Sequence, residues 1–256
     1  MFRLKIILVT QDEPFYLRDP IGYLLDNLPV GVDLCGVVLL GQSPSGRKMG
    51  FLERAWDTLK IFGPQFSLYY GIQLVVSKIS KSGLRDLFVS KGIPVISLNE
   101  SINNESSLRL IKEFKPDLLV SIQGNEVFKR PLIELAPKGC INLHTALLPK
   151  YRGLMPTFWV IKNQEKETGV SVFFVDEGID SGPIIVQRRV KLSNKSQRQL
   201  IKETKQLGMD AIIEGISLIK QERVQLMLND NTEMTYFGFP TREDVVEFRK
   251  VGGRFF

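Results

Sequence analysis

Short apolar segments that alternate with longer, helix-like ones most strongly limit what this chain can fold into. Leu118–Ile122 is a nearly continuous apolar run, and comparable β-prone runs lie at about residues 4–9, 33–40, 92–97 and 140–143. A strand without polar alternation is buried on both faces, as in a parallel sheet covered by helices. Because helix-like segments separate these runs, the pattern predicts an α/β fold with a Rossmann-like, open and mostly parallel sheet and helices on both faces.

The second half of the chain departs from this alternation. Residues 168–175 and 184–190 are both strand-like, and the turn-rich loop between them predicts a late β-hairpin. A helix from about 196 to 220 follows, and the remainder holds one turn and one short helix. We therefore expect a main domain over residues 1–220 and a short C-terminal extension over residues 221–256.

The composition limits the class of ligand and the compartment. The net charge of +6 and the isoelectric point near 9.2 favour an anionic ligand, such as a phosphate or a nucleotide. Cys35 and Cys140 lie in separate apolar runs, so we expect small buried thiols in a reducing cytoplasm rather than a disulfide or a metal site. The N-terminal run is too short for a signal peptide, and no run is long enough to predict a membrane span.

The loop after the first strand argues against a dinucleotide-binding protein. A dinucleotide fold carries Gly-x-Gly-x-x-Gly at this point, whereas this chain has Thr10-Gln-Asp-Glu-Pro-Phe-Tyr16. The missing glycines disfavour a nucleotide-dependent oxidoreductase. The polar and aromatic side chains of the loop indicate either one wall of a substrate site or simply the entry to a helix.

Asn142 and His144 are the first candidate functional residues. They lie two residues apart in a predicted strand, so both point to the same side of the sheet. His144 is the only histidine of the chain, and it follows the carboxyl end of the strand, where open α/β sheets bind their ligands. The pair indicates either an acid–base site or a structural histidine packed beside a strand. The loop of the late hairpin supplies Asp176, Glu177 and Asp180 as carboxylate partners.

These motifs resemble, in order and in spacing, those of a known enzyme family. The matching residues are Asn142-x-His144-x-x-Leu147-Leu148-Pro149, Arg152-Gly153, Thr168-Gly169-Val170 and Asp176-x-Gly178-x-Asp180-x-Gly182. Together they are similar to the formyltransferases that use N10-formyltetrahydrofolate, and the likeness covers roughly residues 117–192. One position departs from the pattern, because the family usually has a serine where this chain has Ala146.

The resemblance implies roles for particular residues and makes residues 1–220 the formyltransferase catalytic domain. The family's catalytic asparagine, histidine and aspartate correspond to Asn142, His144 and Asp180. Formyltetrahydrofolate, the co-substrate, is expected to contact Glu126, Val127, Phe128, Ala146, Leu147, Leu148, Pro149, Asp176, Glu177, Gly178 and Ile179. The reaction that the resemblance implies needs no metal ion.

The resemblance leaves the amine acceptor open. The family includes formyltransferases of glycinamide ribonucleotide, of methionyl-tRNA and of amino sugars on nucleotides. Methionyl-tRNA formyltransferases continue into a C-terminal domain that grips tRNA, and residues 221–256 are too few for it, so we expect tRNA not to be the acceptor. The preferred prediction is a cytoplasmic enzyme, often a homodimer in this family, that formylates a phosphate-bearing amino sugar. A methionyl-tRNA formyltransferase-like activity, formyltetrahydrofolate hydrolysis and non-catalytic folate binding remain alternatives.

Two segments carry no family motif. Residues 48–80 are rich in aromatic and aliphatic side chains, and Gly63–Pro64 divides them into two predicted helices. Such a segment indicates core packing, a subunit interface or a contact with a membrane surface. Residues 188–205 form a basic run, which indicates either a solvated helix face or a phosphate-binding edge.

Overall fold

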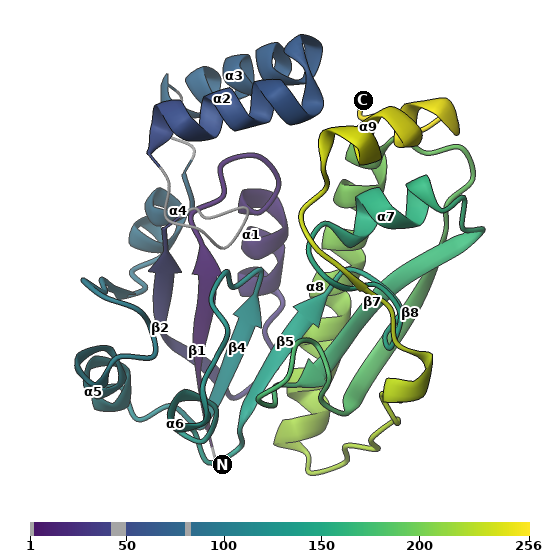
Figure 1. The fold of residues 1–256 in the computed structure, drawn as a ribbon. Helices are drawn as coiled ribbons and strands as arrows, with labels where there is room; N and C mark the ends of the chain where they lie inside the picture. Colours follow the sequence, from purple (N-terminus) through teal and green to yellow (C-terminus); the bar gives the residue numbers. More distant parts are fainter. Residues whose placement is uncertain (1–2, 42–49, 80–82) are drawn as a thin grey trace.

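The computed structural model of the protein describes residues 3–41, 50–79 and 83–256, and seven of its strands form one sheet. In spatial order these strands are β3 (Val95–Ile96), β2 (Val32–Leu40), β1 (Leu4–Gln11), β4 (Leu118–Ile122), β5 (Cys140–His144), β7 (Glu167–Phe174) and β8 (Ile184–Lys191). The strands from β3 to β5 are parallel, whereas β7 pairs antiparallel with both β5 and β8. The predicted open, mostly parallel sheet with a late hairpin is therefore confirmed (Figure 1).

Helices cover both faces of this sheet, because successive residues of a strand point to opposite sides. On β1, the side chains of Leu4, Ile6 and Leu8 pack on one face, while those of Ile7 and Val9 pack on the other. The first face is covered by α1 (Arg18–Asp26), α4 (Leu84–Ser90) and α8 (Gln197–Lys220), and the second by α5 (Glu105–Glu113) and α6 (Arg130–Ile133). The predicted cover of helices on both faces is confirmed.

The remaining helices lie at the carboxyl edge of the parallel strands. In Figure 1 the arrowheads of β1, β2, β4 and β5 point toward α2 and α3, and α9 with the C-terminus lies beside them. These helices are α2 (Phe51–Phe62), α3 (Pro64–Ile79), α7 (Pro156–Lys162) and α9 (Arg242–Lys250). A largely aromatic cluster that includes Phe62, Phe158, Phe248 and Phe255 joins them to the start of α8.

A second, two-stranded sheet ties the C-terminal residues to the main domain. It pairs β6 (Arg152–Gly153) in parallel with β9 (Tyr236–Phe237), and the short 3-10 helix η1 (Asn231–Glu233) precedes β9. Residues after 220 therefore lie against the segment that follows β5. No helix within the described ranges has the length and hydrophobicity needed to cross a membrane.

The aromatic-rich segment forms two helices that meet at Gly63–Pro64, as predicted, although residues 48, 49 and 80 lie outside the described residues. The prediction that this segment packs in the core holds for one side of the two helices only. Phe62 is buried and its ring stacks on that of Phe66 with the centroids 4.4 Å apart, whereas Leu52 and Trp56 are exposed. Core packing of the whole segment is wrong, because only its inner side meets the rest of the chain.

Gly208 allows α8 to lie close against β5, the strand that carries Asn142 and His144. A Cβ atom at Gly208 would lie 2.6 Å from Leu143 Cδ2, which is closer than two carbon atoms can approach. The absence of a side chain at this position thus sets the distance between α8 and the strand. The first turns of α8 consequently reach the carboxyl edge of the sheet.

The start of α8 is fixed by a capping box. Ser196 Oγ accepts a hydrogen bond from Gln199 N at 3.3 Å, and Gln199 Oε1 accepts one from Ser196 N at 2.8 Å. The next two amides, of Gln197 and Arg198, donate to backbone oxygens near the C-terminus, at 2.8 and 3.0 Å. The free N–H groups of the first turn thus have partners from the cap and from the end of the chain.

Replacing Ser196 with alanine removes one half of this capping box. We expect Ser196→Ala to lower the free energy of unfolding by about 1 kcal/mol and the melting temperature by roughly 2–4 °C. Thermal unfolding followed by circular dichroism measures the change. Gln206→Ala, on an exposed position of the same helix, is the control and should leave the melting temperature nearly unchanged. Equal melting temperatures for Ser196→Ala and the wild type would show that the cap contributes nothing.

Candidate active site

A cavity of about 600 Å³ opens at the carboxyl edge of β1, β4 and β5. Its volume lies in the range of small-molecule sites. Its walls come from the loops after these strands, from the β7–β8 loop, from the start of α8 and from residues 236–239. Asn142, His144 and Asp180, which the sequence places on two separate segments, all line it.

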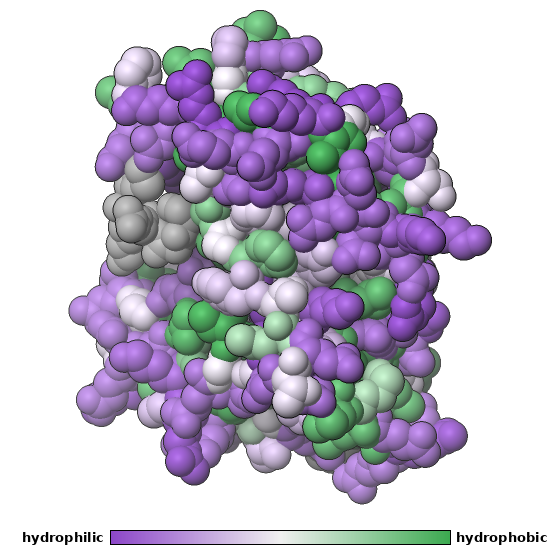
Figure 2. Space-filling view, turned by 45° about the vertical axis from the view of Figure 1, so that its right-hand side comes forward, coloured by the Kyte–Doolittle hydropathy of each residue, from purple (hydrophilic) through white to green (hydrophobic). Residues whose placement is uncertain are grey.

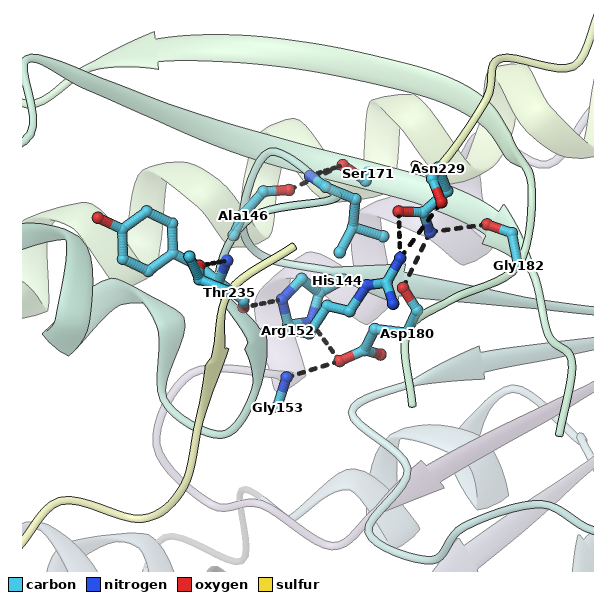
Figure 3. Close-up of polar contacts among 11 residues, drawn as sticks. His144, Ala146, Arg152, Gly153, Ser171, Asp180, Gly182, Asn229 and Thr235 are labelled. Atoms are coloured by element: carbon cyan, nitrogen blue, oxygen red, sulfur yellow. Dashed lines mark hydrogen bonds and ion pairs between the residues drawn. The ribbon is translucent and has the colours of Figure 1, made fainter. Parts of the chain in front are cut away.

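His144 and Asp180 face each other in this cavity (Figure 3). His144 Nδ1 lies 3.5 Å from Asp180 Oδ2. On its other side, the ring donates a hydrogen bond from Nε2 to the backbone oxygen of Tyr151, at 2.7 Å. Because both ring nitrogens face acceptors, only the imidazolium form can donate to both. The two contacts fix the plane of the ring and leave Nδ1 as the nitrogen directed at the carboxylate.

Asp180 is held in an unusual backbone conformation. Its φ is +49°, in the left-handed region, which costs of order 1 kcal/mol or more for a residue with a side chain. Gly153 N donates to Asp180 Oδ2 at 2.9 Å. Asn229 Nδ2 donates to the backbone oxygens of Asp180 and Gly182, at 2.9 and 2.8 Å. These three hydrogen bonds, each worth roughly 1 kcal/mol, together outweigh the strain.

Gly153 must be glycine for the carboxylate of Asp180 to be held in this way. Its φ is +95°, and a Cβ atom would lie 2.3 Å from the backbone oxygen of Phe237. A side chain here would push β6 away from β9. The amide that binds Asp180 would move with it.

Arg152 connects the site to the C-terminal residues. Its side chain is buried, and its guanidinium donates to Asn229 Oδ1 at 2.9 Å (Figure 3). It also donates to Asn231 Oδ1 at 2.8 Å. Asn229 in turn holds the loop that carries Asp180. Residues after 220 therefore contribute contacts that position the site.

The side-chain oxygen of the half-buried Asn142 is a buried acceptor without a partner among the described residues. Its Oδ1 makes no hydrogen bond within the described part of the chain, and the side chain lines the cavity. Leaving such an oxygen unsatisfied costs roughly 1–3 kcal/mol. A ligand that donates a hydrogen bond to it would remove this cost.

Six of the residues predicted to contact the co-substrate line the same cavity, namely Glu126, Val127, Phe128, Asp176, Gly178 and Ile179. The amide N–H groups of residues 125–127 make no hydrogen bond to any described residue. One wall of the cavity therefore combines apolar side chains with free backbone donors. Such a wall suits a flat ring with polar edges.

The other five predicted residues, Ala146, Leu147, Leu148, Pro149 and Glu177, do not line the cavity. The Ser171 hydroxyl binds the backbone of the turn at residues 146–148. Its Oγ donates to Ala146 O at 2.8 Å and accepts from Leu148 N at 3.1 Å. Ser171 thus brings a hydroxyl to the turn in which Ala146 has none (Figure 3). These backbone groups already have protein partners, so we assign them no ligand contact.

The wall on the β1 side carries Glu13 and Lys205. Burial lowers the pKa of Lys205 to about 8, although the nearby Glu13 opposes the shift. Burial also raises the pKa of Glu13, whose carboxylate accepts hydrogen bonds from the amides of Phe15 and Tyr16 at 2.6 and 2.8 Å. Lys205 Nζ donates to Gln123 Oε1. Its other two N–H groups have no partner in the described part of the chain.

Lys205 was not predicted as a site residue, because it belongs to the basic run of residues 188–205. The prediction of a solvated face holds for part of that run, since Arg188 pairs with Glu214 at 2.5 Å and Lys202 is exposed. Lys205 instead lines the cavity. The signal that could have found it is the spacing of Gln197, Ile201, Thr204 and Lys205, which all line the cavity from one face of α8.

No comparable sequence signal marks Asn229, since it lies in a stretch without regular secondary structure, far from the family motifs.

No group of three or more histidine, cysteine, aspartate or glutamate side chains in the described ranges could hold a metal ion.

Comparison with known sequences links more than half of the chain to one family. Residues 73–216, more than half of the chain, match the family model described as formyl transferase. The methionyl-tRNA formyltransferase of Kosmotoga olearia is 38% identical over 156 residues, which is 60% of this chain and 50% of that protein. The chain spans about half the length of the curated relatives it matches.

Solved structures share the fold at lower identity. The phosphoribosylglycinamide formyltransferase of Anaplasma phagocytophilum has a TM-score of 0.62 and 17% identity, over 91% of this chain and 98% of that one. The N-formyltransferase of Helicobacter canadensis, in complex with folinic acid and dTDP-3-aminofucose, has a TM-score of 0.55 and 19% identity, over 94% and 72% of the two chains. At these identities the likeness concerns the fold. By the match over residues 73–216, the chain belongs to the formyl transferase family.

Proposed function

We propose that this protein transfers the formyl group of N10-formyltetrahydrofolate to the amine of a small-molecule acceptor. The observation that carries the proposal is the contact of His144 Nδ1 with Asp180 Oδ2, at 3.5 Å, beside Asn142 in a single cavity. In the reaction the amine forms a bond to the formyl carbon, and the bond from that carbon to N10 breaks. The amine loses one proton and N10 gains one.

Asn142 is the proposed donor to the oxyanion that forms on the formyl oxygen. Its carboxamide has no protein partner for Oδ1 and lies beside His144, so its NH₂ can point at a developing negative charge. Its oxygen can at the same time accept a hydrogen bond from the incoming amine. His144 Nε2 is bonded to Tyr151 O, so Nδ1, which faces Asp180 Oδ2 at 3.5 Å, is the ring nitrogen that can act on a group held between the two residues.

Asp180 is the proposed relay for the proton. Gly153 N and His144 Nδ1 both lie at its Oδ2. Its Oδ1 has no partner within the described residues and can accept a proton from the ammonium of the acceptor or from a bridging water. The contact of His144 Nδ1 with Oδ2 holds the carboxylate in place for this role.

The co-substrate is proposed to lie along the wall formed by residues 125–128 together with Asp176, Gly178 and Ile179. The free amides of residues 125–127 and the apolar side chains of Val127, Phe128 and Ile179 fit the polar edge and the flat faces of a pterin. When bound, the folate supplies the activated formyl group. The chain's own residues orient it and exclude water.

The acceptor is proposed to enter from the opposite wall, which holds Glu13, Tyr16 and Lys205. Our preferred acceptor is an amino sugar carried on a nucleotide. The Helicobacter canadensis N-formyltransferase, whose fold covers 94% of this chain, binds dTDP-3-aminofucose, which supports this choice. Among the described residues, Lys205 is the one lysine that lines the cavity. Because the cavity offers a single lysine, we expect the diphosphate at the mouth of the cavity rather than deep inside it.

Methionyl-tRNA is the second candidate acceptor. The curated relative at 38% identity is a methionyl-tRNA formyltransferase, and the expectation that tRNA is not the acceptor rested only on the length of residues 221–256. A panel of nucleotide-linked amino sugars, glycinamide ribonucleotide and methionyl-tRNA, each incubated with N10-formyltetrahydrofolate, separates the candidates. Mass spectrometry that detects one added formyl group identifies the acceptor, and folate turnover without any formylated product would indicate a hydrolase.

Asp180→Asn tests the proposed relay. The amide cannot accept the proton, so we expect kcat to fall by at least roughly 100-fold. The affinity for 5-formyltetrahydrofolate, measured by calorimetry, should change little, because the folate wall is intact. Glu177→Gln removes a carboxylate from the same loop outside the cavity and should keep wild-type turnover. Near wild-type turnover in Asp180→Asn would contradict the assignment.

The lowered pKa of Lys205 gives a second test. As the pH rises from 7 to 9, Lys205 loses its charge near pH 8 and can no longer attract an anionic or hydroxyl-bearing acceptor as strongly. We expect the dissociation constant of the N-formylated product, which has no titrating amine, to rise over this range. Lys205→Gln should bind more weakly at pH 7 and show a flat profile. Lys202→Gln, exposed on the same helix, should retain the wild-type profile.

A further inference from the structure

The cavity wall at residues 125–128 has no regular secondary structure of its own. Residues 123–129 lie between the end of β4 and the start of α6, outside any helix or strand. The amides of residues 125–127 make no hydrogen bond to any described residue. A segment without a hydrogen-bond ladder keeps one conformation only where side chains from elsewhere hold its backbone. The contacts that hold this segment therefore decide where its free donors point.

Asn103 supplies two of these contacts. Its Nδ2 donates a hydrogen bond to the backbone oxygen of Val127, at 2.9 Å, and its Oδ1 accepts one from the amide of Lys129, at 2.8 Å. One carboxamide thus binds, with both of its ends, backbone groups that lie two residues apart. Asn103 itself does not line the cavity. It therefore reaches the wall from outside the cavity.

The two residues before Asn103 fix its position. Ile102 is fully buried, in the same core cluster as Phe128. Ser101 Oγ accepts a hydrogen bond from Asn103 N at 3.3 Å, and the same hydroxyl donates to the carboxylate of Glu126. The chain then leads directly into α5, which covers this face of the sheet. Asn103 thus extends from a turn that is anchored in the core.

The partners of Asn103 distinguish it from ordinary polar side chains of the surface. Hydrophilic residues cover most of the face shown in Figure 2, on the side of α7 and the β7–β8 hairpin. A pair such as Arg109 with Glu105 joins two exposed side chains within one helix and holds no other segment. Asn103 instead binds the backbone of residues that follow it by 24 and 26 positions. Such a contact determines the course of a loop.

We propose that Asn103 is a positioning residue of the co-substrate site. Its carboxamide fixes the backbone of residues 127–129, and this holds the amides of residues 125–127 in the orientation that receives the polar edge of the pterin. The inference rests on the proposed function, which places the folate along this wall. It adds a residue that lies outside the cavity and apart from the matching motifs.

Calorimetry with 5-formyltetrahydrofolate on the whole chain tests this role. Asn103→Ala removes both hydrogen bonds to the wall, so we expect the dissociation constant of the folate to rise roughly 10-fold. Asn104→Ala is the matched control. Asn104 is exposed, and its side chain donates to Glu100 Oε2 at 2.9 Å rather than to the wall. The control should bind the folate with wild-type affinity.

A second variant keeps the shape of the side chain. Asn103→Asp retains an acceptor for Lys129 N but sets an oxygen against Val127 O, where the wild type has a donor. We expect it, too, to bind the folate more weakly than the wild type. Thermal unfolding should show that all three variants are folded at the temperature of the titration.

The ring signals of His144 separate positioning from a wider loss of structure. His144 is the only histidine, so ¹⁵N-labelled histidine reports on it alone. In free Asn103→Ala these signals should match the wild type, because β5 is not changed. At saturation with 5-formyltetrahydrofolate they should reach the wild-type end point, because only the affinity differs.

Wild-type affinity in Asn103→Ala or in Asn103→Asp would overturn the inference and leave the proposed function intact. Displaced His144 signals in free Asn103→Ala would overturn it as well, since the effect would then extend beyond the wall. A wild-type protein that does not bind 5-formyltetrahydrofolate would contradict the proposed function and the inference together.

Discussion

The site depends on the contact between His144 and Asp180, which brings together a central strand and a loop that follows it by more than thirty residues. Neither segment forms the contact alone. Asp180 holds a strained backbone conformation, and the hydrogen bonds from Gly153 and Asn229 outweigh that strain. Because Asn229 is itself bound by Arg152, the carboxylate is positioned by residues from three parts of the chain.

The cavity has two chemically different walls around this contact. On one side, the amides of residues 125–127, which have no hydrogen-bond partner among the described residues, lie among apolar side chains. On the other, Glu13 and Lys205 both line the cavity, and burial shifts the pKa of each toward its neutral form. This division suits a reaction between two molecules, because each wall can hold one reactant while His144 and Asp180 lie between them.

Much of the fold could be predicted from the sequence, because buried parallel strands and the turn-rich hairpin leave clear patterns in composition and periodicity. The positions of Asn142, His144 and Asp180 followed from ordered motifs. Asn229 could not be predicted, since its role arises from a tertiary contact in a segment without periodicity. Lys205 was hidden in a basic run, where only its side of α8 separates it from solvated neighbours. The sequence left open whether residues 50–79 pack in the core or face a partner, because hydrophobicity alone does not distinguish core from interface.

The single histidine allows the most direct test of the account. Selective ¹⁵N labelling of histidine gives ring signals that belong to His144 alone, and NMR can follow them during a titration with 5-formyltetrahydrofolate. If His144 lies at the site where the folate binds, its ring signals should shift in step with saturation, and Asp180→Asn should change them in the free protein. Folate binding that leaves these signals unmoved would contradict the central claim.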